Sequence, residues 1–147
     1  MGRQRITSKS YMKNIIIVTG GAGFIGSNLI KYLIKKTKYK IISIDNYSTG
    51  SINNHVQHKN VKYIKNDNIH IFNILKNYKK KIKVIFHFGE FSRIYQSFLK
   101  PKECLESNIN NSFAVINFAK DNKIKIIYSA TSSAFGNNGK DENLSPY

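Results

Sequence analysis

The sequence excludes several protein classes by what it lacks. It contains a single cysteine, Cys104, so an internal disulfide is impossible and a reducing, cytoplasmic environment is predicted. No apolar stretch approaches the roughly 20 residues that a membrane span needs, and residues 1–12 lack the apolar segment of a secretory signal. Two prolines and nine glycines are too few for a collagen-like or low-complexity chain. We therefore expect a globular protein with no membrane partner.

Arginine is also scarce, although the formal net charge is +16. Such a charge invites a nucleic-acid partner, but the only arginines are Arg3, Arg5 and Arg93, and direct base reading favours bidentate arginine contacts. The lysines are scattered, and their excess together with asparagine and isoleucine is typical of A/T-rich coding sequence. We expect a solvated basic surface and no nucleic-acid partner. A nucleic-acid-binding protein is the alternative, and its affinity would fall steeply with salt and survive the loss of Gly23.

Strand-like and helix-like segments alternate along the chain of 147 residues, 41% of which are hydrophobic. Short β-branched or apolar runs predict strands at 14–19, 40–45, 61–64, 83–88 and 123–129. Apolar residues at helical spacing predict helices over 25–34, 69–78 and 101–121, and a polar loop covers 46–60. This alternation predicts an α/β, Rossmann-like, doubly wound parallel sheet over residues 14–147, preceded by a polar lead-in at 1–13.

A glycine cluster separates the first predicted strand from the first predicted helix. Gly20 would permit a tight turn, Gly23 would let the backbone approach a pyrophosphate, and Gly26 would let the helix pack against the strand. The start of the helix supplies free N–H groups for phosphates. Asp45 follows Gly26 by 19 positions, at the end of the next strand. Its carboxylate would accept hydrogen bonds from a ribose and repel a 2′-phosphate, so the pattern predicts NAD rather than NADP.

The stretch Thr19–Gly26 (TGGAGFIG) resembles the extended short-chain dehydrogenase/reductase family, in particular nucleotide-sugar epimerases and dehydratases such as UDP-glucose 4-epimerase. Further matches follow in the family's order: Asp45–Gly50 (DNYSTG), Asn66–Asp67, Phe86–Arg93 (FHFGEFSR), Ser107–Ser112 (SNINNS), Tyr128–Gly136 (YSATSSAFG) and Ser145–Tyr147. Because these matches run from residue 14 to the last residue, the resemblance implies the family's fold and its NAD site.

The resemblance also implies which residues form the site. The implied cofactor-binding residues are Gly20, Gly23, Phe24, Ile25, Gly26, Asp45, Asn46, Asp67, Phe88, Gly89 and Asn108. The implied catalytic residues are Tyr147, as general acid and base, and Thr131, whose hydroxyl would hold the reacting sugar oxygen. A phenol with its ordinary pKa near 10 needs a nearby positive charge to work at neutral pH. In the family a lysine four residues later supplies it. That position lies beyond Tyr147, so we expect the N-terminal part of a longer enzyme, with five strands of a larger sheet.

The implied reaction is NAD-dependent epimerisation of a nucleotide sugar, with a UDP-sugar as the expected substrate, in a homodimer formed through helices that flank the sheet. Tyr147 would take the proton of a sugar hydroxyl while hydride passes to NAD and then returns to the opposite face of the sugar. A 4,6-dehydratase or another sugar-nucleotide oxidoreductase of the same family is one alternative. Family dehydratases place Asp-Glu directly after the threonine, where this chain has Ser132 and Ser133, and this favours an epimerase or a simpler oxidoreductase. A non-catalytic NAD-binding fragment is the other. No metal is implied.

The family resemblance implies no role for three further residues of chemical interest. The family has small residues at the positions of Gly89 and Glu90, so Glu90 would bring a carboxylate close to the cofactor. His87 lies inside an apolar strand, and we predict a core histidine with satisfied hydrogen bonds rather than a ligand or a base. Cys104 has no histidine nearby in the sequence and is predicted to be a buried small hydrophobe.

Overall fold

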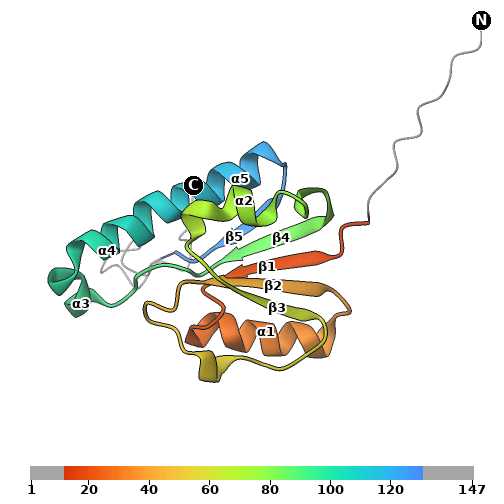
Figure 1. The fold of residues 1–147 in the computed structure, drawn as a ribbon, viewed down its shortest axis with the longest axis horizontal. Coiled ribbons are helices and arrows are strands. Elements are labelled where there is room, and N and C mark those ends of the chain that lie inside the picture. The colour runs from red at the N-terminus through yellow and green to blue at the C-terminus, as the bar shows by residue number, and fades with distance from the viewer. Residues whose placement is uncertain (1–11, 131–147) are drawn as a thin grey trace, which may run out of the picture.

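Five parallel strands form one sheet in the computed structural model, which describes residues 12–130 (Figure 1). The strands are β1 (Ile15–Thr19), β2 (Lys40–Asp45), β3 (Val61–Lys65), β4 (Ile82–His87) and β5 (Lys125–Tyr128). Their order is β3-β2-β1-β4-β5, and every neighbouring pair is parallel. The chain thus starts in the middle of the sheet, builds outward to β3, and then crosses to β4. The five predicted strands are confirmed, with ends that differ by at most two residues.

Helices cover both faces of the sheet (Figure 1). The α-helices are α1 (Phe24–Lys36), α2 (Ile71–Leu75), α3 (Ile94–Leu99), α4 (Pro101–Leu105) and α5 (Ser112–Asp121). Short 3-10 turns occupy η1 (Ile52–Asn54), η2 (Asn68–His70) and η3 (Lys79–Lys81), and η4 (Glu106–Asn111) is a π-helical turn. No helix of residues 12–130 is long and apolar enough to cross a membrane.

The structure agrees with some of the predicted helices and differs from others. The predicted helix at 25–34 is confirmed as α1. The one predicted over 69–78 is shorter, because η2 takes its first residues and α2 ends at Leu75. The one predicted over 101–121 consists of three helical segments that follow one another directly. These are α4, the π-helical turn η4, and α5. The pattern did not predict α3, because its six residues are too few to show a helical period. Its apolar side chains are exposed: Ile94, Tyr95, Phe98 and Leu99.

The central strand β1 is buried on both faces because its side chains alternate between two cores. Ile15 and Ile17 pack with residues of α2 and α5, including Phe118, and Ile16 and Val18 pack with residues of α1. All five residues of β1 are buried. An uninterrupted apolar run is what a parallel strand covered on both faces requires. The two cores fix β1, and so they fix the position of the glycine turn that follows it.

Candidate functional site

The turn between β1 and α1 is a close-packed piece of backbone that leaves no space for a side chain at Gly20 or Gly26. Gly20 has a φ of +70°, a conformation that favours glycine, and a Cβ there would collide with the carbonyl group of Phe88. A Cβ on Gly26 would collide with the carbonyl oxygen of Gly20 and lie 2.8 Å from Gly21 Cα. The first glycine thus lets the chain turn against β4, and the third lets α1 start directly above the turn.

The start of α1 offers free backbone donors. Gly23 is the N-cap residue, no side chain caps the helix, and its first turn holds no acidic residue. The first hydrogen bond into the helix runs from Ser27 N to Gly23 O over 3.0 Å, so the N–H groups of Phe24, Ile25 and Gly26 precede it. The side chains of Phe24 and Ile25 are exposed. Such free N–H groups, together with the helix dipole, form a binding site for phosphate.

Asp45 ends β2 next to the glycine turn. Its Oδ2 accepts a hydrogen bond from Ala22 N over 2.8 Å, and its Oδ1 accepts one from Tyr47 N, also over 2.8 Å. The residue is 9% exposed. A carboxylate offers about four acceptor positions, so two backbone bonds leave acceptor capacity for ligand hydroxyl groups. Asp45 therefore fixes the shape of the turn and still presents a charged acceptor beside it.

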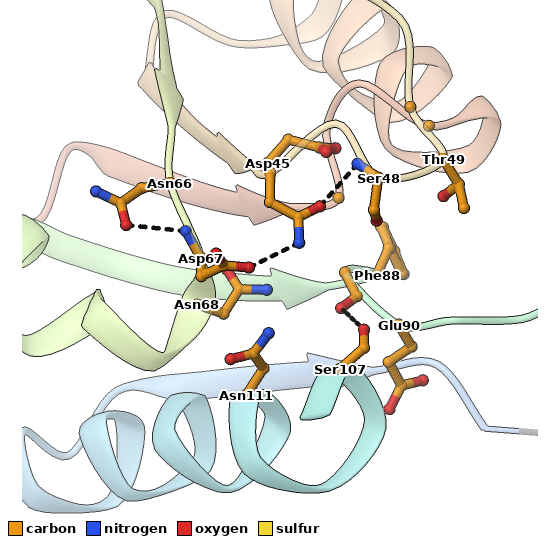
Figure 2. Close-up of a pocket in the computed structure, with 15 residues that line it drawn as sticks. Asp45, Ser48, Thr49, Asn66, Asp67, Asn68, Phe88, Glu90, Ser107 and Asn111 are labelled. Carbon is orange, nitrogen blue, oxygen red and sulfur yellow. Dashed lines mark hydrogen bonds between the residues drawn. The ribbon is translucent and has the colours of Figure 1, made fainter. Parts of the chain in front are cut away.

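Polar side chains from the loops after β2 and β3 surround Asp45 (Figure 2). Asn46 Nδ2 donates to Asp67 Oδ1 over 2.7 Å. Asn68 is 6% exposed, and within residues 12–130 its Oδ1 has no hydrogen-bond partner. Buried polar atoms are nearly always paired, so this amide oxygen is an exception among the residues that line the site.

Two hollows meet at the glycine turn. The first opens over the ends of β2, β3 and β4. The second lies beside it at the start of α1. Ten of the eleven predicted cofactor-binding residues line one of the two hollows or both. The first takes in Gly20, Gly23, Asp45, Asn46, Asp67, Phe88 and Gly89 (Figure 2). The second also touches Gly20, Gly23 and Phe88 and adds Phe24, Ile25 and Gly26. Both include Glu90, and the second extends to Arg93 and Ser129. The structure thus brings together side chains that the sequence separates widely.

Asn108 is the predicted cofactor residue that lines neither hollow. Its Oδ1 accepts from Phe91 N over 2.6 Å, and its Nδ2 donates to Phe91 O over 2.9 Å. The amide thereby ties the loop after β4 to η4. Two other residues of the same turn, Ser107 and Asn111, line the first hollow instead (Figure 2). Sequence analysis did not select these two, although their spacing of four on a helical segment was a usable signal.

A chain of hydrogen bonds runs behind the hollows from β1 to η4 and α5. His87 is fully buried, with Nδ1 2.6 Å from Thr19 Oγ1 and Nε2 2.9 Å from Ser112 Oγ. Thr19 Oγ1 already accepts two backbone N–H groups, at 3.2 and 3.3 Å, so its own proton points to Nδ1. The Nε2–H then donates to Ser112, whose proton is shared by Glu90 Oε1 at 3.3 Å and Ser107 O at 3.4 Å. The predicted core histidine is confirmed.

Burial keeps the ring of His87 neutral. It lowers the pKa of His87 below the ordinary 6.5, and the negative charge of Glu90 opposes this only in part. A neutral imidazole has one donor and one acceptor, which is the form that the chain of hydrogen bonds uses. The ring therefore joins β1, β4 and α5 without carrying a charge.

The comparison with protein families supplies the remaining observation. Residues 16–147 match the model of the NAD dependent epimerase/dehydratase family. The chain belongs to this family. Its Rossmann-like fold and the resemblance drawn from the glycine motif are thereby confirmed.

Members of the epimerase/dehydratase family resemble this chain in sequence and in structure. A dTDP-D-glucose 4,6-dehydratase of Dictyostelium discoideum is 35% identical over 136 residues, which cover 87% of this chain and 31% of that protein. A UDP-N-acetylglucosamine 4-epimerase of Methanobrevibacter ruminantium is 30% identical with a TM-score of 0.72, over 90% of this chain and 42% of that one. The UDP-glucose 4-epimerase of Thermotoga maritima is 27% identical with a TM-score of 0.72, over 82% and 38%.

The chain thus spans less than half the length of these epimerase/dehydratase relatives. Both predicted catalytic residues of the family, Thr131 and Tyr147, lie outside the described residues. One smaller prediction is wrong: Cys104 is partly exposed rather than buried. Its helix α4 buries no residue, so this position lies outside the core.

Proposed function

We propose that the two hollows together bind NAD. The support is the juxtaposition of the close-packed glycine turn, the start of α1 without a side-chain cap, and the Asp45 carboxylate. The pyrophosphate would lie on the N–H groups of Phe24, Ile25 and Gly26. The adenosine ribose would donate to Asp45, and Asp67 would meet adenosine or its surroundings. When bound, NAD supplies an acceptor that takes a hydride and returns it.

The order of the strands supports a position for each end of the ligand. A doubly wound sheet binds a dinucleotide across the point where the strand order reverses, one nucleotide on each side. Here the reversal lies between β1 and β4. Since Asp45 and Asp67 follow β2 and β3, adenosine belongs over that half. The nicotinamide then belongs over β4 and β5, in the hollow lined by Phe88, Glu90 and Ser129.

For the whole enzyme we infer NAD-dependent epimerisation of a nucleotide sugar, with a UDP-sugar as the substrate. Thr131 would hold the reacting sugar oxygen, and Tyr147 would take its proton and give it back. Ser129 lines the nicotinamide half of the site and precedes Thr131 by two positions in the sequence. This nearness along the chain supports Thr131 as the substrate-binding hydroxyl.

A 4,6-dehydratase is the second candidate, because the Dictyostelium relative carries that name. Dehydration needs an additional acid and base, and Ser132 and Ser133 occupy the positions after Thr131. Serine hydroxyls are poor substitutes for carboxyl groups in proton transfer. Incubation of the full-length enzyme with UDP-glucose or dTDP-glucose, followed by proton NMR, separates the candidates. A 4-epimer supports the first, and a 4-keto-6-deoxy sugar supports the second.

Substitution of Asp45 by asparagine tests the cofactor choice. We expect the dissociation constant for NAD+ to rise about tenfold, which corresponds to about 1.4 kcal/mol. The preference for NAD+ over NADP+ should fall further, because the repulsion of a 2′-phosphate is lost together with the charge. Isothermal titration calorimetry with both dinucleotides measures the two changes.

The control for this variant is Asp121→Asn, which removes the same charge from the exposed end of α5. It should leave both affinities unchanged. If Asp45→Asn keeps the full preference for NAD+, the carboxylate does not contact the ribose and the proposed placement of adenosine is wrong.

A further inference from the structure

Glu90 occupies the half of the site opposite Asp45. It lies three residues after the end of β4 and lines both hollows, together with Ser129 and Arg93 in the second. Asp45 lines the first hollow and not the second. Asp45 and Asp67 thus lie on the half proposed for adenosine, whereas Glu90 is the carboxylate of residues 12–130 that lines the second hollow. The proposed contact with a ribose accounts for Asp45 and leaves Glu90 without a role.

Hydroxyl groups from two directions hold the Glu90 carboxylate in place. Oε1 accepts a short hydrogen bond from Tyr128 OH and a longer one, of 3.3 Å, from Ser112 Oγ. Oε2 accepts from Ser129 Oγ over 3.4 Å. The bond to Glu90 is the main reason that the pKa of Tyr128 rises to about 12, with burial and the charge of Glu90 adding to it. Tyr128 therefore stays a donor, and the carboxylate has a defined position at the end of β5.

No positive side chain neutralises this carboxylate within residues 12–130. Its partners there are hydroxyl groups, and no lysine or arginine forms an ion pair with it. Arg93 lines the second hollow as well but does not pair with Glu90. His87 is connected to Glu90 through Ser112, and burial keeps its ring neutral by lowering its pKa. A negative charge thus faces the nicotinamide half of the site without a cationic partner.

We propose that Glu90 is a positioning residue whose fixed carboxylate makes the site prefer the oxidised, positively charged nicotinamide ring over the reduced, neutral one. The inference rests on the proposed NAD site. A negative carboxylate strongly attracts a positive ring a few ångströms away in a partly buried site. The reduced ring is neutral, so it gains no such attraction. The same preference favours return of the hydride to the sugar carbon, with the proton going back to the sugar oxygen, as an epimerase requires.

The test compares the affinities of NAD+ and NADH for the unsubstituted chain and for Glu90→Gln. Glutamine keeps an oxygen to accept from Tyr128 but removes the charge. We expect the dissociation constant for NAD+ to rise about tenfold and that for NADH to stay the same or fall. Calorimetry follows NAD+, and fluorescence of the reduced ring follows NADH, so no turnover is needed.

Two matched variants make the result specific. Asp121→Asn removes one negative charge far from the site and should leave the ratio of the two affinities unchanged. Tyr128→Phe removes a donor but keeps the carboxylate, so it should retain the preference for NAD+. NMR titration of tyrosine signals gives an independent readout, because Glu90→Gln should lower the pKa of Tyr128 from about 12 toward its ordinary 10.0.

The outcomes separate this inference from the proposed function. If Glu90→Gln weakens NAD+ and NADH equally, or weakens neither, Glu90 has at most a structural role and the inference is wrong while the NAD site stands. If the unsubstituted chain binds neither dinucleotide, the NAD site itself is wrong and the inference is overturned with it.

Discussion

Gly26→Ala is expected to abolish detectable NAD+ binding and to lower the free energy of unfolding by about 3 kcal/mol. The added Cβ would collide with the carbonyl oxygen of Gly20 and lie 2.8 Å from Gly21 Cα. Both neighbours are backbone, so neither can rotate away. Relief requires that α1 move from β1, and this displaces the N–H groups that the phosphates would meet. Urea unfolding measures the first effect, and calorimetry the second.

Gly23→Ala is the matched control for this clash. A Cβ at Gly23 would meet only Gly20 O, at 3.3 Å, and it would stand at the N-cap position of α1. We expect the free energy of unfolding to change by less than about 1 kcal/mol. Equal destabilisation by Gly23→Ala and Gly26→Ala would contradict the view that close approach of α1 to the turn is what demands the third glycine.

His87→Leu is expected to lower the free energy of unfolding by about 3 kcal/mol. Leucine fills much of the ring's volume but removes both nitrogens. The hydroxyl of Thr19 then loses its acceptor, and that of Ser112 loses its donor, inside the molecule. Urea unfolding near pH 7.5 gives the magnitude. His70→Leu is the control, because His70 is exposed and should change the free energy of unfolding little.

The same variant should also change the pH dependence of stability. Since burial lowers the pKa of His87 in the folded chain below 6.5, the unfolded chain binds more protons in mildly acidic solution. The contribution of the neutral ring is therefore complete above pH 6.5 and is lost as the pH falls from 6.5 toward the lower, folded-state value. His87→Leu should lose less stability than the unsubstituted chain over this interval. A parallel loss in both would show that His87 does not titrate on unfolding.

Local patterns predicted the parts of the molecule that depend on neighbouring residues. The run of isoleucines before Thr19 predicts a strand buried on both faces, and the cores above and below β1 bear this out. The glycine spacing together with Asp45 predicts a turn, a helix start and an acidic strand end, and all three lie side by side. These features succeed because each arises from backbone geometry within one strand-turn-helix unit.

The parts that the sequence did not predict depend on contacts between distant segments. Asn108 was selected from a run rich in asparagine, but only the fold shows that its amide meets Phe91. The π-helical turn leaves no periodic signature, although it decides which side chains of η4 reach the hollow. The partners of Glu90 come from α5 and from the end of β5. No spacing rule within one element connects those positions.

The two bonds of Asp45 to backbone amides have a consequence for binding entropy. Because Ala22 N and Tyr47 N already donate to this carboxylate, the glycine turn and the loop after β2 are fixed relative to each other before a ligand arrives. A ligand that finds its site preorganised gives up its own freedom but does not have to restrict that of the protein. The residue expected to recognise the ribose thus also reduces the conformational entropy lost when the ribose binds.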